Sequence, residues 1–218
     1  MLIVFDLDGT LIDSRRDLAE STNEMLATYG APELAIDRVA MMVGEGARVL
    51  VERALAASGL DPAEPEALAR FRRIYDQRLL IHTRPYDGVP EMVAHARTLG
   101  PLAVLTNKPE APTHRLLDAF DLSSNFRRVI GGDSRYPRKP EPAGLQALMA
   151  EFDATPHTTW LVGDSMIDVE TARRAGTQLC VVLYGFGHLR GELVLDGRES
   201  RAQTAADVTR ILSGSSIL

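Results

Sequence analysis

The stretch "IVFDLDGTLIDS", residues 3–14, places acidic side chains directly after an apolar run. The run covers residues 2–5 and is continuous rather than alternating, which is typical of a strand buried on both faces of a parallel sheet. Asp6 and Asp8 follow it, and the "DGT" that ends at residue 10 is typical of a turn. Ligands of open parallel sheets bind beyond the carboxyl ends of the strands. The stretch therefore predicts a functional site at the end of the first strand.

Short apolar runs recur along the chain and alternate with helix-like segments. Further strands are expected at 102–105, 128–130, 160–162 and 179–183. Helices are expected at 88–100, 110–120, 141–152 and 168–176. Strands that alternate with helices predict an α/β fold with a doubly wound parallel sheet.

One interval, from about residue 15 to residue 82, breaks this alternation. It contains amphipathic patterns such as "DLAESTNEMLATYG" and "ARVLVERALAASG", and no segment typical of a strand. We interpret it as an α-helical domain, residues 14–84, inserted into a core domain made of residues 1–13 and 85–218. The carboxyl-terminal residues 201–218 are expected to form a short helix and a frayed tail.

Composition and charge narrow the possible classes of protein. The chain has 218 residues, 45% hydrophobic and 25% charged, which is ordinary for a globular protein. Its net charge of −6 offers no electrostatic footprint for nucleic acid or an anionic membrane. No apolar run reaches the roughly 20 residues of a membrane-spanning helix, and a strand that starts at residue 2 leaves no room for a signal peptide. Cys180 is expected to be a buried small hydrophobe. We expect a cytoplasmic monomer or homodimer.

Polar residues follow the predicted strands where each strand ends. A threonine, an asparagine and a lysine follow the strand at 102–105. An aspartate follows the strand at 160–162, a second comes a helical turn later, and "RKPEP" precedes this strand. Because strand ends meet at one edge of a parallel sheet, four carboxylates, a hydroxyl and an ammonium group should converge there, from Asp6, Asp8, Asp164, Asp168, Thr106 and Lys139.

Four carboxylates need a compensating charge. Two unit charges ~4 Å apart repel by about 4 kcal/mol at an effective dielectric of 20. No histidine or cysteine is placed to join them, so the ligands are all oxygen atoms. Oxygen ligands favour a hard cation such as Mg²⁺, which combines carboxylates with phosphate oxygens. The hydroxyl, turn amides and ammonium suit a phosphate group. The sequence thus predicts Mg²⁺ and a phosphate at this edge.

Four motifs resemble the signature motifs of the haloacid dehalogenase-like hydrolase superfamily: "DLDGTLIDS", "LTNKP", "RKPEP" and "VGDSMIDVETARRAG". They occur in the family's order, and the resemblance covers the whole chain. The helical insertion takes the position of the family's α-helical (type 1) cap. The resemblance implies a Rossmann-like core, a Mg²⁺ cofactor and a small-molecule phosphate ester as substrate.

The resemblance also implies catalytic roles for three residues. Asp6 would be the nucleophile that forms an aspartyl-phosphate. Asp8 would protonate the leaving oxygen and later deprotonate water. Lys139 would offset the negative charge of Asp6 and of the phosphoryl group.

Metal and phosphate ligands are implied in the same way. The Asp6 carboxylate, the backbone carbonyl of Asp8 and Asp164 would hold Mg²⁺, with support from Asp168. The phosphoryl group would be bound by Thr106 and the Asn107 amide.

A segment of the insertion, "VGEGARVLVERAL" at residues 43–55, resembles the matching segment of phosphoglycolate phosphatases. Its loop at Gly44 and Glu45 would read the leaving group, which suggests 2-phosphoglycolate as the substrate. A G-x-G turn is also an ordinary helix start, and Arg48 is expected to be solvated. Three alternatives stay open: a phosphatase for another sugar phosphate, a nucleotide or pyrophosphate; a phosphomutase like the β-phosphoglucomutases; and a non-catalytic binding protein.

Other residues near the motifs are expected to be structural. Asp13 is interpreted as part of a linker or as a helix N-cap. Lys108 and Arg138 are expected to be solvated or secondary. The five histidines show no paired ligand spacing and are not assigned to a metal. The segment 185–192 is expected to form a loop beside the site, and no role is assigned to it.

Overall fold

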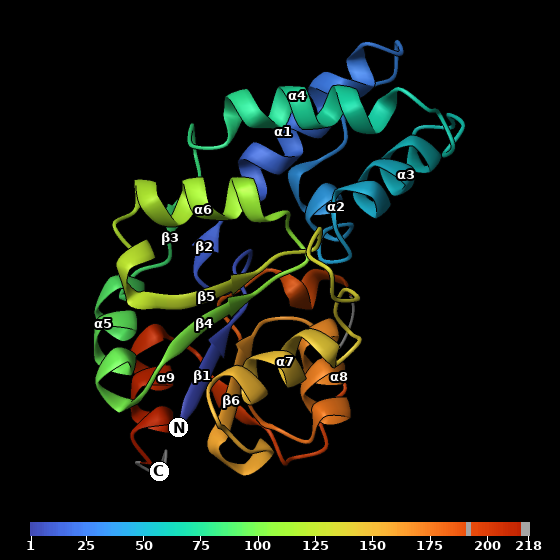
Figure 1. The fold of residues 1–218 in the computed structure, drawn as a ribbon. Helices are drawn as coiled ribbons and strands as arrows, with labels where there is room; N and C mark the ends of the chain where they lie inside the picture. The colour runs from blue at the N-terminus through green and yellow to red at the C-terminus, as the bar shows by residue number, and fades with distance from the viewer. Residues whose placement is uncertain (191–192, 215–218) are drawn as a thin grey trace.

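Six strands form one parallel sheet in the order β5-β4-β1-β6-β7-β8 (Figure 1). The computed structural model describes residues 1–190 and 193–214, so part of the predicted frayed tail and of the 185–192 loop lies outside the described residues. The α/β doubly wound fold is confirmed. The sequence does not predict β8, because its Ser-Arg-Ala contains no apolar run. The strands are β1 (Leu2–Phe5), β4 (Leu102–Leu105), β5 (Phe126–Ile130), β6 (Thr159–Gly163), β7 (Gln178–Val182) and β8 (Ser200–Ala202).

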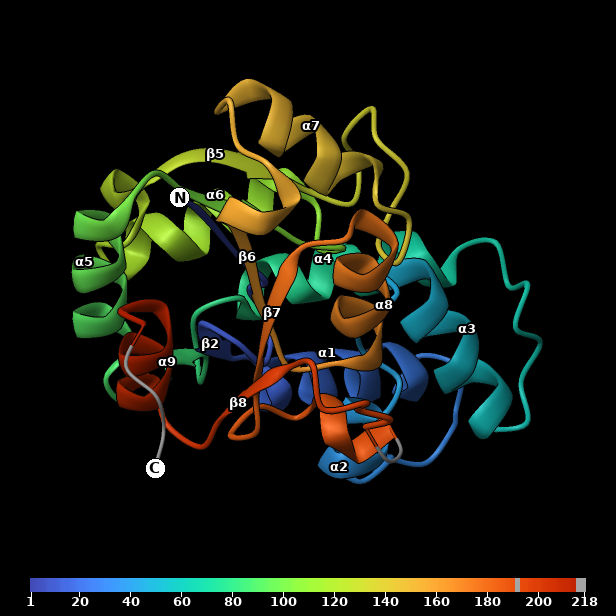
Figure 2. The same ribbon diagram turned by 90° about the horizontal axis from the view of Figure 1, so that it is seen from below.

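Helices cover both faces of this sheet. They are α5 (Val89–Leu99), α6 (Glu110–Ala119), α7 (Ala143–Glu151), α8 (Met166–Ala175) and α9 (Ala205–Leu212). Alternate residues of β1 point to opposite faces. Leu2 and Val4 are buried in a core with α7 and α8, whereas Ile3 and Phe5 are buried in a core with α5, α6 and α9. Figures 1 and 2 show α5 and α9 on one side of the sheet and α7 and α8 on the other. This two-sided burial explains why β1 is a continuous apolar run.

The centre of the sheet is the point where the strand order reverses. From β1 the chain passes to β4 and β5 on one side, and then crosses to β6, β7 and β8 on the other. Phe5 is in register with Val104 of β4 and with Val162 of β6. The three central strands therefore end at nearly the same level, and the residues that follow them meet at the position where open α/β sheets bind ligands.

Four helices lie between β1 and β4: α1 (Arg15–Ala27), α2 (Ile36–Ala40), α3 (Ala47–Ala57) and α4 (Ala67–Arg78). All four fall within residues 14–84, which we call the helical insertion. Figure 1 shows it above the carboxyl ends of the strands. Its two ends pair as a short antiparallel ribbon of β2 (Ile12–Asp13) and β3 (Arg84–Pro85), which the sequence does not predict. The division of the chain into two domains remains a prediction.

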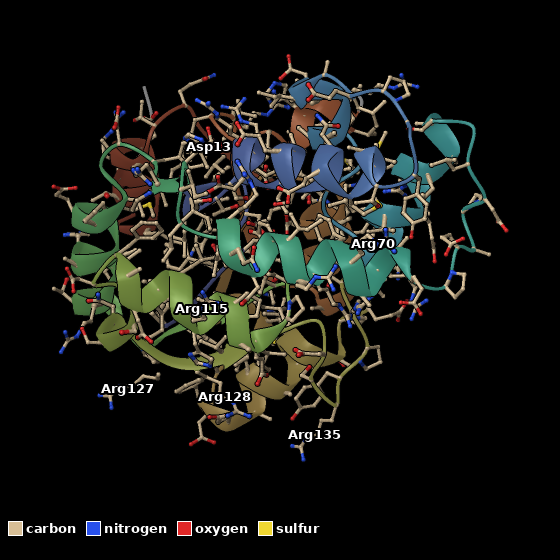
Figure 3. All side chains as sticks on the ribbon, turned by 90° about the horizontal axis from the view of Figure 1, so that it is seen from above. Asp13, Arg70, Arg115, Arg127, Arg128 and Arg135 are labelled. Carbon is tan, nitrogen blue, oxygen red and sulfur yellow. The ribbon has the colours of Figure 1, made fainter. Side chains whose placement is uncertain are left out.

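The edge and interior of the sheet carry the residue types that their positions require. Arg127 and Arg128 of the edge strand β5 are exposed and point away from the molecule (Figure 3). Charged side chains on an edge strand oppose pairing with another chain. Cys180 is buried in β7, as expected. None of the described helices has the length and apolar character needed to cross a membrane.

A buried carboxylate joins the two ends of the insertion. Asp17, in the first turn of α1, accepts hydrogen bonds from the backbone N–H of His82 at 2.9 Å and from the backbone N–H and hydroxyl of Thr83, both at 2.7 Å. These donors compensate the burial of its charge. Glu20 lies nearby and pairs with Arg78, so an ion pair within the protein already compensates the charge of Glu20. Asp17 therefore fixes the start of α1 to the segment that returns to the core.

Asp17→Ala is expected to lower the free energy of unfolding by about 3 kcal/mol, because it leaves buried donors of two residues without an acceptor. Urea unfolding followed by circular dichroism measures the change. Asp118→Ala, at an exposed position of α6, is the matched control and should change stability by no more than about 0.5 kcal/mol. Equal loss in both variants would contradict the role given to Asp17.

Candidate active site

The ends of β1 and β6 bring three carboxylates together. Asp6 follows β1, Asp164 follows β6, and Asp168 lies in the first turn of α8. One carboxylate oxygen of each lies within 4.8 Å of the others. Asp164 and Asp168 are buried, whereas 13% of the Asp6 side chain is exposed. Of the three, Asp6 is thus the carboxylate most open to a ligand.

Lys139 places an ammonium group inside this cluster. Its Nζ lies 2.9 Å from Asp6 Oδ1 and 2.7 Å from Asp168 Oδ1, and 2% of its side chain is exposed. Burial opposes the charged form, but Asp168 and Asp6 raise the pKa of Lys139 above its usual value. The lysine therefore stays protonated at neutral pH and holds Asp6 and Asp168 in fixed orientations.

The start of α8 orients Asp168. The backbone N–H and hydroxyl of Ser165, the N-cap residue, donate to Asp168 Oδ2 at 3.1 and 2.6 Å. The Asp168 backbone N–H donates to the Ser165 hydroxyl, which completes a capping box. Because Oδ2 is used in this way, Oδ1 faces Lys139. A local helix signal in the sequence therefore positions a charged group of the site.

One ammonium group does not compensate three carboxylates of which two are buried and the third is mostly buried. Burial raises the pKa of Asp6 to about 6 against the opposing effect of Lys139. Burial, followed by Asp168 and Asp6, raises the pKa of Asp164 well above its usual value. A divalent cation held by these carboxylates would favour their ionised forms. No histidine or cysteine of the described residues joins this cluster, and its oxygen ligands suit Mg²⁺. The residues present therefore fit the predicted Mg²⁺ site.

Two glycines allow the backbone to approach Asp164 closely. A Cβ atom at Gly9, where φ is +87°, would lie 2.0 Å from Asp164 Oδ2. A Cβ atom at Gly187 would lie 2.3 Å from the Asp164 carbonyl oxygen, and the Gly187 backbone N–H donates to Asp164 Oδ2 at 2.6 Å. The described part of the 185–192 loop thus lies beside the site, and it packs against the Asp164 carboxylate.

Two side chains hold Asp8, and one of them corrects a sequence prediction. The Ser14 hydroxyl donates to Asp8 Oδ1 at 2.5 Å, and Lys108 Nζ donates to both Asp8 oxygens at 3.1 Å. The sequence predicts that Lys108 is solvated or secondary; it is buried, so the first of these alternatives is wrong. It follows β4 at the centre of the sheet, where the insertion covers the strand ends. Tyr75 of α4 accepts a further hydrogen bond from Lys108 Nζ at 2.7 Å.

Thr106 and Asn107 follow β4, and both line the same pocket as Asp6. The Asn107 side-chain amide donates to the carbonyl oxygens of Gly44 at 2.8 Å and Lys139 at 2.9 Å, and it accepts from the Lys139 N–H at 2.9 Å. The side chain therefore connects the end of β4 with the insertion and with the loop that carries Lys139. A phosphate contact by Thr106 and the Asn107 amide remains a prediction.

The predicted leaving-group loop contributes unequally to the pocket. Gly44 lines it, whereas the Glu45 carboxylate forms an ion pair with Arg53 at 2.5 Å. Arg48 is exposed, as expected. Arg138 is also exposed, and its Nε donates to a backbone carbonyl oxygen at 2.7 Å. Any role of Glu45 in recognising the leaving group remains a prediction.

The charged groups open into a pocket of about 380 Å³ between the strand ends and the insertion. The core contributes most of its polar lining, from Asp6, Asp8, Thr106, Lys108 and Asp164. The insertion contributes a largely apolar lining, which includes Leu18, Val43, Ala47, Leu50 and Phe71. This arrangement suits a small ester whose phosphate faces the core.

Sequence reasoning missed three residues of this pocket region and misjudged Lys108. Ser14 ends the motif "DLDGTLIDS" and Lys108 lies in "LTNKP", so their positions next to predicted site residues could have indicated a role in the site. Gly187 lies in the 185–192 loop, which the sequence places beside the site. Tyr75 carries no comparable signal, because it reaches Lys108 across 33 residues and from a different helix.

Residues 3–182 match the family model described as haloacid dehalogenase-like hydrolase. The chain is 42% identical over 196 residues to "Phosphoglycolate phosphatase 1" of Pseudomonas aeruginosa, covering 87% of this chain and 71% of that protein. It is 39% identical over 201 residues to the phosphoglycolate phosphatase of Nitrosospira multiformis, covering 89% and 88%. A solved structure of a predicted phosphoglycolate phosphatase from Haemophilus somnus has a TM-score of 0.89 at 30% identity, covering 96% of each chain.

Asp164→Asn is expected to stabilise the metal-free protein and to abolish its response to Mg²⁺. The amide oxygen still accepts the Gly187 hydrogen bond, but the cost of a buried charge disappears. In EDTA the melting temperature should rise by about 3 °C, equivalent to about 1 kcal/mol. Added Mg²⁺ should raise the melting temperature of the wild type but not that of Asp164→Asn. Differential scanning fluorimetry measures both effects.

The matched control is Asp133→Asn, which changes an exposed carboxylate at the pocket. This variant should behave as the wild type does in EDTA and in Mg²⁺. If Mg²⁺ stabilises Asp164→Asn as strongly as the wild type, Asp164 is not a metal ligand.

Proposed function

The chain belongs to the haloacid dehalogenase-like hydrolases and is a phosphatase of phosphoric monoesters, and we propose that it hydrolyses 2-phosphoglycolate with Mg²⁺ through an aspartyl-phosphate. One observation carries the mechanism: the partly exposed Asp6 carboxylate is bound by Lys139 at 2.9 Å and lines the same pocket as Asp8. A nucleophile and a proton donor thus face one small chamber.

Asp6 acts as the nucleophile. Lys139 holds Oδ1, which leaves Oδ2 to attack phosphorus. The bond from phosphorus to the leaving oxygen breaks as the bond to Asp6 forms. Lys139 offsets the negative charge of the reacting groups. The Asp6 carboxylate, the Asp8 carbonyl and Asp164, with support from Asp168, would hold Mg²⁺, which supplies further positive charge at the phosphoryl group.

Asp8 moves the proton in both half-reactions. Asp8 enters the cycle in its protonated form and gives this proton to the leaving oxygen, which departs as an alcohol while Asp8 becomes a carboxylate. It then takes a proton from a water molecule that attacks the aspartyl-phosphate, releasing inorganic phosphate and free Asp6. The hydrogen bond from Ser14 at 2.5 Å and the contacts with Lys108 fix the Asp8 carboxylate for this exchange.

The substrate proposal is supported by the relatives and by the pocket. Both curated relatives described above are phosphoglycolate phosphatases, and they are similar to this chain over most of its length. A pocket of about 380 Å³ lies at the small end of the range for ligand sites. A small ester fits this space, with its phosphate at Asp6 and its leaving group toward the insertion. A cytoplasmic location, a monomeric or homodimeric state, and the lack of nucleic-acid and membrane partners remain predictions.

In the presence of Mg²⁺, the purified protein should cleave 2-phosphoglycolate with a kcat/KM about 100-fold above that for p-nitrophenyl phosphate, because binding of the leaving group adds specificity. EDTA should abolish the activity. Asp6→Asn should lower kcat by about 10⁴-fold or more, since it removes the nucleophile, whereas Asp133→Asn should keep wild-type activity. Phosphate release measures these rates. When reactions with 2-phosphoglycolate labelled in its phosphoryl group are quenched with acid, the label should remain on the wild-type protein.

The same assays separate the alternatives. Equal turnover of both esters would reject 2-phosphoglycolate as the specific substrate and point to another phosphate ester. Isomerisation of glucose 1-phosphate without net phosphate release would establish a phosphomutase. Phosphate release by Asp6→Asn at the wild-type rate would exclude Asp6 as the nucleophile.

A further inference from the structure

Lys108 is an unusual feature of the pocket, because it is a buried cation that the metal cluster does not use. Among the described residues that line the pocket, the other cationic side chain is Arg72 of α4, which is exposed. Lys139 pairs with two carboxylates, Asp6 and Asp168, whereas Lys108 pairs with one, Asp8. Only 5% of the Lys108 side chain is exposed. A buried, charged side chain with a shifted pKa that lines a pocket is a candidate functional group.

The position of Lys108 is fixed from two directions. Its Nζ lies 3.1 Å from both oxygens of Asp8 in the core and 2.7 Å from the hydroxyl of Tyr75 in the insertion. Nζ also lies 4.7 Å from the centre of the Tyr75 ring. The ammonium group is therefore held in place before a substrate enters, and ordering it costs little on binding.

Tyr75 adds a hydrogen-bond donor next to this cation. Its ring stacks on that of Phe71 with 5.7 Å between the ring centres. Its hydroxyl oxygen accepts the bond from Lys108, and no acceptor for the hydroxyl proton is found in the part of the chain that the structure describes. Burial raises the pKa of Tyr75 to about 12, so the hydroxyl keeps its proton at neutral pH. Lys108 and Tyr75 together thus present an ammonium group and a hydroxyl proton.

We propose that Lys108 and Tyr75 bind the carboxylate of the leaving group and thereby select short phosphorylated acids over neutral phosphate esters. This inference rests on the proposed function. A single CH₂ group separates the bridging oxygen of 2-phosphoglycolate from its carboxylate. The group that binds this carboxylate must therefore lie beside Asp8, which protonates the bridging oxygen, and Lys108 is in contact with Asp8.

Among the described lining residues, the other cation, Arg72, is exposed and therefore screened by solvent. The insertion side is lined by apolar residues such as Val43, Leu50 and Phe71. A carboxylate that loses its hydration there without a cation would bind poorly. A neutral leaving group loses less hydration, but it leaves the Tyr75 hydroxyl proton without a charged acceptor. The lining therefore favours a substrate whose carboxylate reaches Lys108.

The test compares two esters of nearly equal size, 2-phosphoglycolate and 2-hydroxyethyl phosphate, with the Mg²⁺-loaded enzyme. We measure the ratio of their kcat/KM values, because a general loss of catalysis affects both esters and cancels in the ratio. Tyr75→Phe should lower the ratio about tenfold, the usual effect of one hydrogen bond to a charged group. Lys108→Met should lower it about 100-fold or more, because it removes the paired charge. Arg72→Gln is the control and should keep the wild-type ratio.

Each result has a defined meaning. If the wild type does not prefer 2-phosphoglycolate, the proposed substrate fails and the carboxylate-binding role fails with it. If the wild type prefers it and both Tyr75→Phe and Lys108→Met keep that preference, only the role of Lys108 and Tyr75 is overturned. A loss of preference in Arg72→Gln alone would assign the carboxylate to Arg72.

A binding measurement covers the case in which Lys108→Met folds poorly. Glycolate should inhibit wild-type hydrolysis of 2-hydroxyethyl phosphate competitively, and ethylene glycol should do so at least about 100-fold more weakly. Tyr75→Phe, which keeps the ring and its stacking, should weaken inhibition by glycolate about tenfold. Unchanged inhibition by glycolate in this variant would contradict the proposal.

Discussion

Three carboxylates meet at the end of the central strands, but Lys139 pairs with only two of them, Asp6 and Asp168, and the uncompensated negative charge constrains the rest of the site. Burial raises the pKa of both Asp6 and Asp164, so the folded chain carries an electrostatic cost that a divalent cation would relieve. The fold tolerates this cost because two hydrophobic cores, one on each face of the sheet, stabilise β1 independently of the site. A stable scaffold thus holds an unstable arrangement of charges, which is the usual relation between a fold and its active site.

The helical insertion is tied to the core at positions that matter for chemistry. Asn107 connects the end of β4 with the Gly44 carbonyl of the insertion, and Lys108 connects Asp8 with Tyr75. Asp17 joins the two ends of the insertion, beside the core, through Thr83. The groups that would receive a leaving group therefore come from both parts of the chain. Movement of the insertion relative to the core would change the surroundings of Asp8 directly, which relates the position of the insertion to proton transfer.

The error at Lys108 has a clear physical cause. In the sequence it stands beside a proline in a short polar stretch, which is typical of an exposed turn. In the structure the insertion covers this turn, and the Asp8 carboxylate and the Tyr75 hydroxyl stabilise the buried ammonium group. Exposure of a side chain at a strand end depends on what packs over it. That information comes from a segment some thirty residues earlier, and the local pattern around Lys108 does not contain it.

The sequence by itself determined the parallel sheet, the helical insertion and the gathering of Asp6, Asp164 and Lys139, because strand burial and the positions of strand ends are properties of local patterns. The capping box of Ser165 and Asp168 is also a local pattern, but the helix expected at 168–176 begins earlier in the structure, at Met166. Only the tertiary structure decided the pairing of Lys108 with Tyr75, the close approach of Gly187 to Asp164, and the added strand β8. Each of these depends on contacts between segments distant in the chain, whose distances are set by packing rather than by neighbouring residues.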